Sequence, residues 1–238
     1  MSGIRAGKKG YPETEKSGQF FRSTMIDTDS RLRAARGFGK TETEASAAVF
    51  RKLKERGHPE APPPTVSDGW GGIREAMIEV YGKIPEYSGR GRRPSRKQPQ
   101  PGWKYLQIVK QRDGKGRFPG IRFKAVYGDL EKLAGLLGKS TAYVERTHLT
   151  IRTFSSRLTR KSIGFSKEIG IHKACAVLED MYYNLIRPHK TLRLKNGNGG
   201  VRKWKKRTPA MAAGLTDQIW TLKELFTTVV IGEQHSAG

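Results

Sequence analysis

The chain has 238 residues, of which 46 are Lys or Arg and 22 are Asp or Glu, so its formal net charge is +24. The length allows one or two domains with a buried core, and nine Phe, eight Tyr and four Trp exclude a fully disordered chain. A single cysteine, Cys175, excludes an internal disulfide framework, and no apolar run reaches the roughly 18 residues of a membrane span.

The N-terminal part of the chain predicts a β-hairpin followed by a helix. Residues 20–27 favour a strand that ends at an acidic turn, and residues 31–38 alternate in polarity like a returning second strand. Thr41 and Glu44 form a capping-box pair, which marks the start of a helix. Apolar residues at helical spacing follow, and Gly57 ends the predicted helix.

The middle of the chain predicts further strands around a basic insertion. A short strand at 65–67 leads into the sequence Asp68-Gly-Trp-Gly-Gly and then into a helix with Ile73, Met77, Ile78 and Tyr81 on one face. The segment SGRGRRPSRKQPQPG is rich in Gly, Pro and Arg and predicts a flexible arm. Two extended stretches follow at 103–111 and 117–128, and the residues 112–115 between them are a plausible hairpin turn.

The C-terminal half predicts mainly helices. A short amphipathic helix is expected at 129–138, a longer helical stretch at 141–164 and another at 167–186. In the last of these we expect a buried stripe, which would also place Cys175 in the core; the stripe comprises Ile171, Ala174, Val177, Leu178, Met181 and Leu185. Strands that alternate with helices in this way indicate a mixed sheet flanked by helices, an α/β fold.

The positive charge is concentrated in two segments. Residues 88–124 contain 12 basic residues and one acid, and residues 187–207 contain nine basic residues and no acid. Together they supply +20 of the net +24. Dense positive charge without acids to pair with favours a polyanionic partner, above all nucleic acid. Trp204 lies within the second segment, where it could stack on a base or anchor the segment to the core.

Carboxylates are the best candidates for chemistry in this chain. No phosphate-binding glycine motif, serine-nucleophile motif or zinc motif is present, and the histidines are scattered. Asp27 and Asp68 follow predicted strands, and Glu145 lies near the start of a predicted helix that is otherwise basic. Carboxylates brought together would favour Mg²⁺ (or Mn²⁺) between them, as in two-metal phosphoryl transfer. The alternative is structural: Asp27 caps a turn, Asp68 caps a helix and Glu145 favours a helix N-terminus.

These residues lie in motifs that resemble the DDE-type transposases of bacterial insertion sequences, closest to the insertion-sequence-one type. The likeness is carried by IDTDSRLRAARGFGKTETEA (26–45), TVSDGWGGIREAM (65–77), YVERTHLTIRTFSSRLTRKSIGFSK (143–167), YYNLIRPHKTLR (182–193) and RTPAMAAGLTD (207–217). The resemblance implies an RNase H-like fold with a five-stranded mixed sheet. It also implies an Asp-Asp-Glu triad that binds two Mg²⁺, in which Asp68 is the second carboxylate and Glu145 the third.

One departure from the family concerns the first carboxylate. In these transposases it lies on the first strand, before the strand that residues 20–27 resemble, and this chain has no Asp before Asp27. Either Asp27 is the first carboxylate, or the first carboxylate lies upstream of Met1, and we expect the second. The resemblance also implies that Arg152, two helical turns after Glu145, holds the DNA end.

The sequence therefore predicts an RNase H-like catalytic core over 1–165 and a helical, basic region over 166–238. We expect a cytoplasmic, nucleoid-associated bacterial or archaeal enzyme that acts on double-stranded DNA at insertion-sequence ends, as a homo-oligomer and without a membrane. A catalytically inactive DNA-binding remnant and a structure-selective nuclease are the alternatives. The predicted DNA contacts are Arg146, Arg152, Arg90, Arg92, Arg93, Arg96, Lys97, Lys203, Lys205, Lys206 and Arg207.

Overall fold

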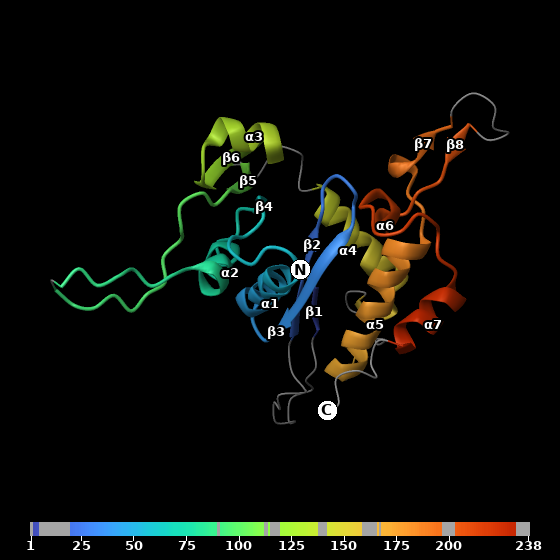
Figure 1. The fold of residues 1–238 in the computed structure, drawn as a ribbon, viewed down its shortest axis with the longest axis horizontal. Coiled ribbons are helices and arrows are strands. Elements are labelled where there is room, and N and C mark those ends of the chain that lie inside the picture. The colour runs from blue at the N-terminus through green and yellow to red at the C-terminus, as the bar shows by residue number, and fades with distance from the viewer. Residues whose placement is uncertain are drawn as a thin grey trace. The chain divides into compact units, whose positions relative to one another are not determined.

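The chain folds as two compact units, each with helices and strands (Figure 1). A computed structural model describes residues 2–4, 20–89, 91–111, 114, 120–137, 142–158, 166, 168–196 and 203–231. Unit 1 comprises Met1–Met25 and Ala34–Phe165, and unit 2 comprises Ile26–Arg33 and Ser166–Gly238. One boundary between the units falls between Phe165 and Ser166. The turn at 26–33, however, belongs to unit 2, since its residues contact the C-terminal segment.

The first three strands form one sheet, which we call sheet A. Its order is β1 (Ser2–Ile4), β2 (Phe20–Ile26) and β3 (Arg33–Gly39), with β1 antiparallel to β2. The backbone NH of Asp27 donates to the carbonyl oxygen of Leu32 at 2.8 Å across the turn between β2 and β3. The strands predicted at 20–27 and 31–38 are therefore confirmed.

Helix α1 (Glu42–Arg56) begins and ends where the sequence predicts. The Thr41 hydroxyl accepts from the Glu44 NH at 3.1 Å, while the Glu44 carboxylate accepts from the Thr41 NH at 3.4 Å. Gly57 ends the helix with φ 146°, a backbone conformation that favours glycine. Val49 and Phe50 are buried in the core of unit 1.

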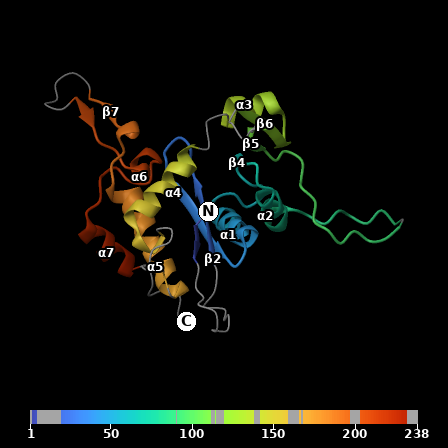
Figure 2. The same ribbon diagram turned by 180° about the vertical axis from the view of Figure 1, so that it is seen from behind.

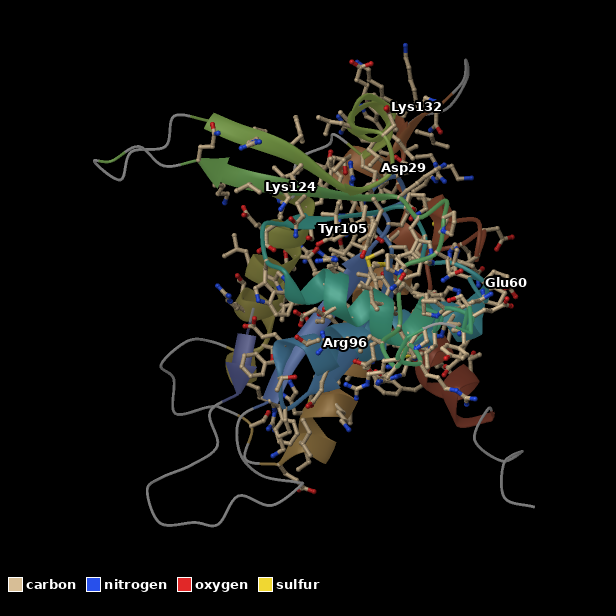
Figure 3. The ribbon with its side chains drawn as sticks, turned by 90° about the vertical axis from the view of Figure 1, so that its left-hand side faces the viewer. Asp29, Glu60, Arg96, Tyr105, Lys124 and Lys132 are labelled. Carbon is tan, nitrogen blue, oxygen red and sulfur yellow. The ribbon has the colours of Figure 1, made fainter. Side chains whose placement is uncertain are left out.

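A second sheet, sheet B, carries the hydrophobic cores of unit 1 on its two faces. Strand β4 (Thr65–Asp68) runs parallel to β5 (Tyr105–Gln111), and β5 runs antiparallel to β6 (Gly120–Tyr127). Tyr105 belongs to the core that includes α1 and α2 (Gly72–Tyr81), whereas Leu106 packs with α3 (Leu130–Leu137). Figure 3 shows Tyr105 between the strands of sheet B and helix α2. Alternate residues of β5 thus face opposite cores.

The expected basic insertion at 88–124 is therefore only partly an exposed arm. Its second half supplies β5 and most of β6, and Tyr105 and Leu106 on β5 are completely buried. A nearly continuous apolar run is what a strand covered on both faces requires. The described part of the chain is a mixed α/β fold with two separate three-stranded sheets, and the five-stranded RNase H-like sheet stays a prediction.

Helix α4 (Ala142–Phe154) is shorter than the helical stretch predicted at 141–164. The chain leaves the helix at Ser155 and forms a single 3₁₀ turn, Ser156–Leu158. Residues 159–165 lie outside the described residues. Ile151 is buried, whereas Leu149 and Phe154 are exposed.

Unit 2 is built around helix α5 (Ile169–Met181), which continues as a π-helical turn, Tyr182–Ile186. A 3₁₀ turn (Lys190–Leu192), the short strands β7 (Leu194–Lys195) and β8 (Trp204–Lys205), and the helices α6 (Pro209–Ala212) and α7 (Leu222–Ile231) follow. The two strands pair antiparallel with each other.

The buried face of α5 differs from the predicted stripe. Ile171, Ala174, Val177 and Leu178 are exposed, and Cys175 is only half-buried, so the expected apolar stripe and the core cysteine are wrong. The residues that are buried are His172, Ala176 and Asp180. The two polar residues among them have partners outside α5: Arg33 pairs with Asp180, and the Ser166 hydroxyl lies 3.0 Å from Nδ1 of His172.

Candidate functional site

Asp68 is the last residue of β4, and its side chain is exposed where the strand ends. Its Oδ1 accepts a hydrogen bond from the Trp70 NH at 3.3 Å, which folds the following loop back over the strand end. Gly72 begins α2 beneath the Trp70 ring, and a Cβ at this position would overlap the ring. The expected helix cap is therefore absent, since the N-cap of α2 is Gly71 and no side chain caps it.

A buried polar network lies directly behind Asp68. The Ser67 hydroxyl is 2.7 Å from the Tyr105 hydroxyl, and Nε2 of Gln107 donates to Tyr105 at 3.1 Å and to the Trp70 carbonyl at 3.2 Å. Burial raises the pKa of Tyr105, and the charge of Asp68 raises it further, although the hydrogen bonds with Ser67 and Gln107 oppose this shift. The phenol stays protonated at neutral pH, and the network fixes the backbone that carries Asp68.

Glu145 lies in the first turn of α4, and a basic residue of sheet B contacts it. The Lys110 ammonium donates to Oε1 of Glu145 at 2.7 Å, and both side chains are more than half exposed. Lys110 lies on β5, so this ion pair joins the start of α4 to sheet B. An exposed pair of this kind contributes only about 0–1 kcal/mol, which leaves the Glu145 carboxylate available to a competing cation.

The strand register places Asp68 and Lys110 on the same face of sheet B. Asp68 pairs with Ile108 in the parallel ladder, and Lys110 lies two residues further along β5, about 6.6 Å along the strand. Residues two apart on a strand point to the same face. Because Lys110 contacts Glu145, the two predicted carboxylates lie near the same face and the same end of this sheet.

Asp27 has a different environment, in the turn of unit 2. Its carboxylate accepts from the Ser30 NH at 2.9 Å, from the Asp29 NH at 3.4 Å and from the Ser30 hydroxyl. Burial alone would raise its pKa, but these hydrogen bonds and the charge of Arg31 outweigh that effect and lower the pKa. Asp27 caps its turn, which is the structural alternative that its sequence position left open.

The first part of the predicted basic arm lies in an exposed loop, described at residues 83–89 and 91–98, which extends away from α2 (Figures 1 and 2). Two backbone hydrogen bonds between Lys83 and Gln98, at 3.1 and 2.9 Å, close its base. Arg92, Arg93 and Arg96 are exposed along it, and the Lys97 ammonium donates to the Glu79 carbonyl at 2.5 Å. Lys97 thus helps to hold the base of the loop. Arg90 lies outside the described residues.

The other predicted DNA contacts lie on α4 and around β8. Arg146 is exposed and Arg152 is half-exposed on α4. Lys203, Lys205 and Lys206 are exposed, whereas Arg207 is half-buried and donates to the Met211 carbonyl at 3.0 Å. Arg207 therefore helps to hold α6. Trp204 is 36% exposed, so it is not an anchor into the core.

Lys110 is a residue of the candidate site that the sequence analysis did not identify. It lies in the basic insertion, and nothing in the sequence distinguishes it from its neighbours. Its contact with Glu145 spans 35 positions of the chain, so only the pairing of β4 with β5 and the position of α4 reveal it.

The described residues contain no group of three or more His, Cys, Asp or Glu side chains that could hold a metal ion. Asp68 and Glu145 thus stay candidate oxygen ligands, and the described residues place no third such side chain with them. Two carboxylates with exposed oxygens nevertheless suit Mg²⁺, which is commonly bound by one or two carboxylates together with substrate phosphates and water.

Comparison of the chain with protein-family models, with curated proteins and with solved structures gives no match. The likeness to transposases therefore depends on the motifs of the chain itself. Among the described helices, none has both the length and the apolar character needed to cross a bilayer.

Proposed function

We propose that this protein is a DDE-type DNA transposase, or the catalytic part of one, in which Asp68 and Glu145 hold Mg²⁺ at the end of sheet B. The observation that carries the proposal is that strand β5 links both carboxylates to one end of sheet B: Asp68 pairs with Ile108 on β5, and Lys110 of the same strand contacts Glu145. The motifs around both residues are those that resemble the family. The exposed basic segments supply the charge expected of a protein that binds DNA.

Each part of the site has a role in this proposal. Mg²⁺, when bound, would activate the attacking oxygen and neutralise charge on the phosphate that is cleaved. Asp68 would hold it from a strand end that the Tyr105 network keeps rigid, and Glu145 would hold it after releasing Lys110. The freed Lys110 ammonium would then pair with a phosphate oxygen. Its positive charge would thus be paired with Glu145 in the absence of DNA and with a phosphate in its presence.

The reaction follows from phosphoryl transfer on DNA. A water oxygen attacks a phosphodiester at the element end, one P–O bond forms and another breaks, and a 3′-hydroxyl leaves. That 3′-hydroxyl then attacks a target phosphodiester in the same way. Arg146 and Arg152, which follow Glu145 on α4, would hold the phosphates of the cleaved end. We expect the protein to act as a homo-oligomer on paired ends.

The test is metal-dependent nicking of duplex DNA that carries the ends of the protein's own insertion element. Asp68→Asn and Glu145→Gln keep the shape of the side chains and remove their charge. Each should lower the nicking rate by about 1,000-fold or more, because several kcal/mol of transition-state stabilisation is lost. Mn²⁺ binding, measured by electron paramagnetic resonance without DNA, should weaken in both variants.

A matched control shows whether the loss of nicking is specific to Asp68 and Glu145 or follows from removing any exposed carboxylate. Glu131 lies in the first turn of α3, as Glu145 lies in the first turn of α4, and it is also exposed. Glu131→Gln should nick at the wild-type rate. Wild-type nicking by Asp68→Asn or by Glu145→Gln would overturn the proposal.

A second candidate function is DNA binding without cleavage. The observation that favours it is the engagement of the Asp27 carboxylate in its own turn, where it accepts a hydrogen bond from the Ser30 NH. A third carboxylate beside Asp68 and Glu145 is not among the described residues. Salt-dependent DNA binding by the wild-type protein, with no nicking in Mg²⁺ or Mn²⁺, would establish this alternative.

A further inference from the structure

The C-terminal unit presents a two-stranded basic ribbon, residues 193–196 and 203–206, which we call the β7–β8 ribbon. Lys195 pairs with Trp204 and Leu194 with Lys205, and the Asn196 NH donates to the Lys203 carbonyl at 3.0 Å. Within unit 2 the ribbon extends away from α5 and α7 (Figures 1 and 2). The side chains of both strands are exposed, so the ribbon supports no core.

The two faces of the ribbon carry different chemistry. Directly paired residues of an antiparallel ribbon share a face, and neighbours along a strand alternate. Lys195 and Trp204 therefore lie on one face, and Leu194 and Lys205 lie on the other. Arg193 joins the first face, since its guanidinium carbon lies 4.1 Å from the centre of the Trp204 ring. One face thus combines a guanidinium, an ammonium and an indole.

The position of Arg193 suits directed hydrogen bonds to a base edge rather than general attraction to the charge of DNA. Contact with the flat face of Trp204 restricts the guanidinium, so less side-chain entropy is lost when its donors bind. A guanidinium held in this way presents two parallel donors at its edge, a geometry that matches the O6 and N7 acceptors of guanine. A lysine at this position would supply only a point charge.

The sequence on either side of the ribbon contains no acidic residue. Between Asp180 and Asp217 the chain has nine basic residues and no Asp or Glu. An exposed ribbon of this kind repels a second copy of itself and attracts a polyanion.

We propose that the β7–β8 ribbon inserts into the major groove of duplex DNA, with Arg193 reading guanine and Lys195 and Lys205 contacting phosphates. Two strands lie about 4.8 Å apart, and with side chains they fit a groove about 12 Å wide but not a minor groove about 6 Å wide. The inference rests on the proposed function for the identity of the partner as DNA. It assigns to unit 2 a DNA contact that is independent of Asp68 and Glu145.

The first experiment measures the affinity of the full chain for duplex element-end DNA in EDTA over a range of salt concentrations. Lys195→Gln/Lys205→Gln should reduce the slope of log affinity against log salt by about 1.8, since each lost phosphate contact contributes about 0.9. The matched control is Lys173→Gln/Lys223→Gln, which removes two exposed lysines of unit 2 outside the ribbon. Equal slopes for the ribbon variant and the control variant would overturn the inference.

The second experiment uses Arg193→Lys, which keeps the charge but removes the two-donor edge. The salt slope should stay unchanged, while discrimination between the element end and random duplex should fall by about 5- to 150-fold. Dimethyl sulfate footprinting, which reports guanine N7 in the major groove, should show at least one protected guanine that becomes reactive in this variant. Unchanged discrimination with no protected guanine would overturn the assignment of Arg193.

Single-stranded DNA gives a further arm of the test. If Trp204 instead stacks on an unpaired base, Trp204→Ala should weaken single-strand binding and leave duplex binding unchanged, which would overturn insertion into the groove. Because all binding assays are done in EDTA, they do not depend on catalysis. If the ribbon variants change DNA binding as expected but the protein never nicks DNA, the proposed function is disproved and this inference stands. If the protein nicks DNA but the ribbon variants bind DNA like the controls, this inference is disproved and the proposed function stands.

Discussion

In unit 1 the carboxylates of Asp68 and Glu145 are exposed, one at the end of a strand and the other at the start of a helix. In unit 2, by contrast, the carboxylates of Glu179 and Asp180 lie against a buried guanidinium. The Arg33 side chain is 1% exposed, and its Nη1 lies 2.8 Å from Asp180 and 3.3 Å from Glu179. The same guanidinium stacks 4.0 Å from the centre of the Tyr183 ring.

The difference teaches which acidic residues of this chain can take part in chemistry. A buried, paired carboxylate cannot exchange its partner for a metal ion without leaving an uncompensated charge in the core. The exposed Glu145 can exchange Lys110 for another cation at little cost. Asp27 stands between the two kinds: it is exposed, but Ser30 and Asp29 already donate hydrogen bonds to its carboxylate.

The largest expected effect comes from breaking the buried cluster of unit 2. Arg33→Met should lower the free energy of unfolding by about 3–5 kcal/mol, because it leaves the Asp180 carboxylate buried and without its cation. Chemical denaturation followed by circular dichroism measures the change. Arg56→Met, at an exposed arginine near the end of α1, should change it by less than about 0.5 kcal/mol.

A double variant tests the cause of that loss. Arg33→Met/Asp180→Leu removes the closer pair of charges together and should recover part of the stability, since only Glu179, whose side chain is 15% exposed, is then left without the arginine. If the double variant were less stable than Arg33→Met alone, the pairing of these two residues could not be the main effect of the arginine.

A smaller effect is expected at the turn of Asp27. The pKa of this carboxyl lies below its ordinary value of 3.8 in the folded protein, so the folded protein binds fewer protons than the unfolded chain. The stability that the ionised Asp27 carboxylate contributes is therefore complete above that ordinary pKa and is lost as the pH falls through the folded-state pKa. Asp27→Asn should cost about 1 kcal/mol at pH 7, through weaker hydrogen bonds with the turn, and less as the pH falls below about 4.

Denaturation of the wild type and of Asp27→Asn at a series of pH values measures this difference. Asp217→Asn, at an exposed aspartate of the same unit, serves as the matched control. A stability difference for Asp27→Asn that stays constant from pH 7 to pH 3 would mean that the charge of this carboxylate does not stabilise the turn.

The smallest change in stability is expected at the exposed ion pair of unit 1. Lys110→Met should alter the free energy of unfolding by less than about 1 kcal/mol. Without the competing ammonium, Mn²⁺ should bind up to about fivefold more tightly in the absence of DNA. Nicking should fall, because Lys110 would no longer pair with a DNA phosphate. Weaker Mn²⁺ binding in this variant would show that Lys110 orients Glu145 rather than competes for it.

Much of the local structure could be predicted from the sequence, because the signals are local. Thr41, Glu44 and Gly57 mark the ends of α1 through contacts between residues three or four positions apart. The end of β4 at Asp68 follows from a short β-branched run and the glycines after it. The identification of Asp68 and Glu145 as candidate ligands rests on motifs around single residues, and their function stays a prediction.

The sequence by itself determined most of the strands and helices, the concentration of positive charge and the candidate carboxylates, since these depend on neighbouring residues and on composition. It did not predict strands β7 and β8 or the end of α4 at Phe154. Only the tertiary structure decided which face of α5 is buried, because Arg33 lies 147 positions before Asp180 and no periodicity within the helix records that partner. It likewise decided that Lys110 meets Glu145 and that Arg193 stacks on Trp204. Pairings between distant segments depend on how strands align, and a one-dimensional pattern does not specify that alignment.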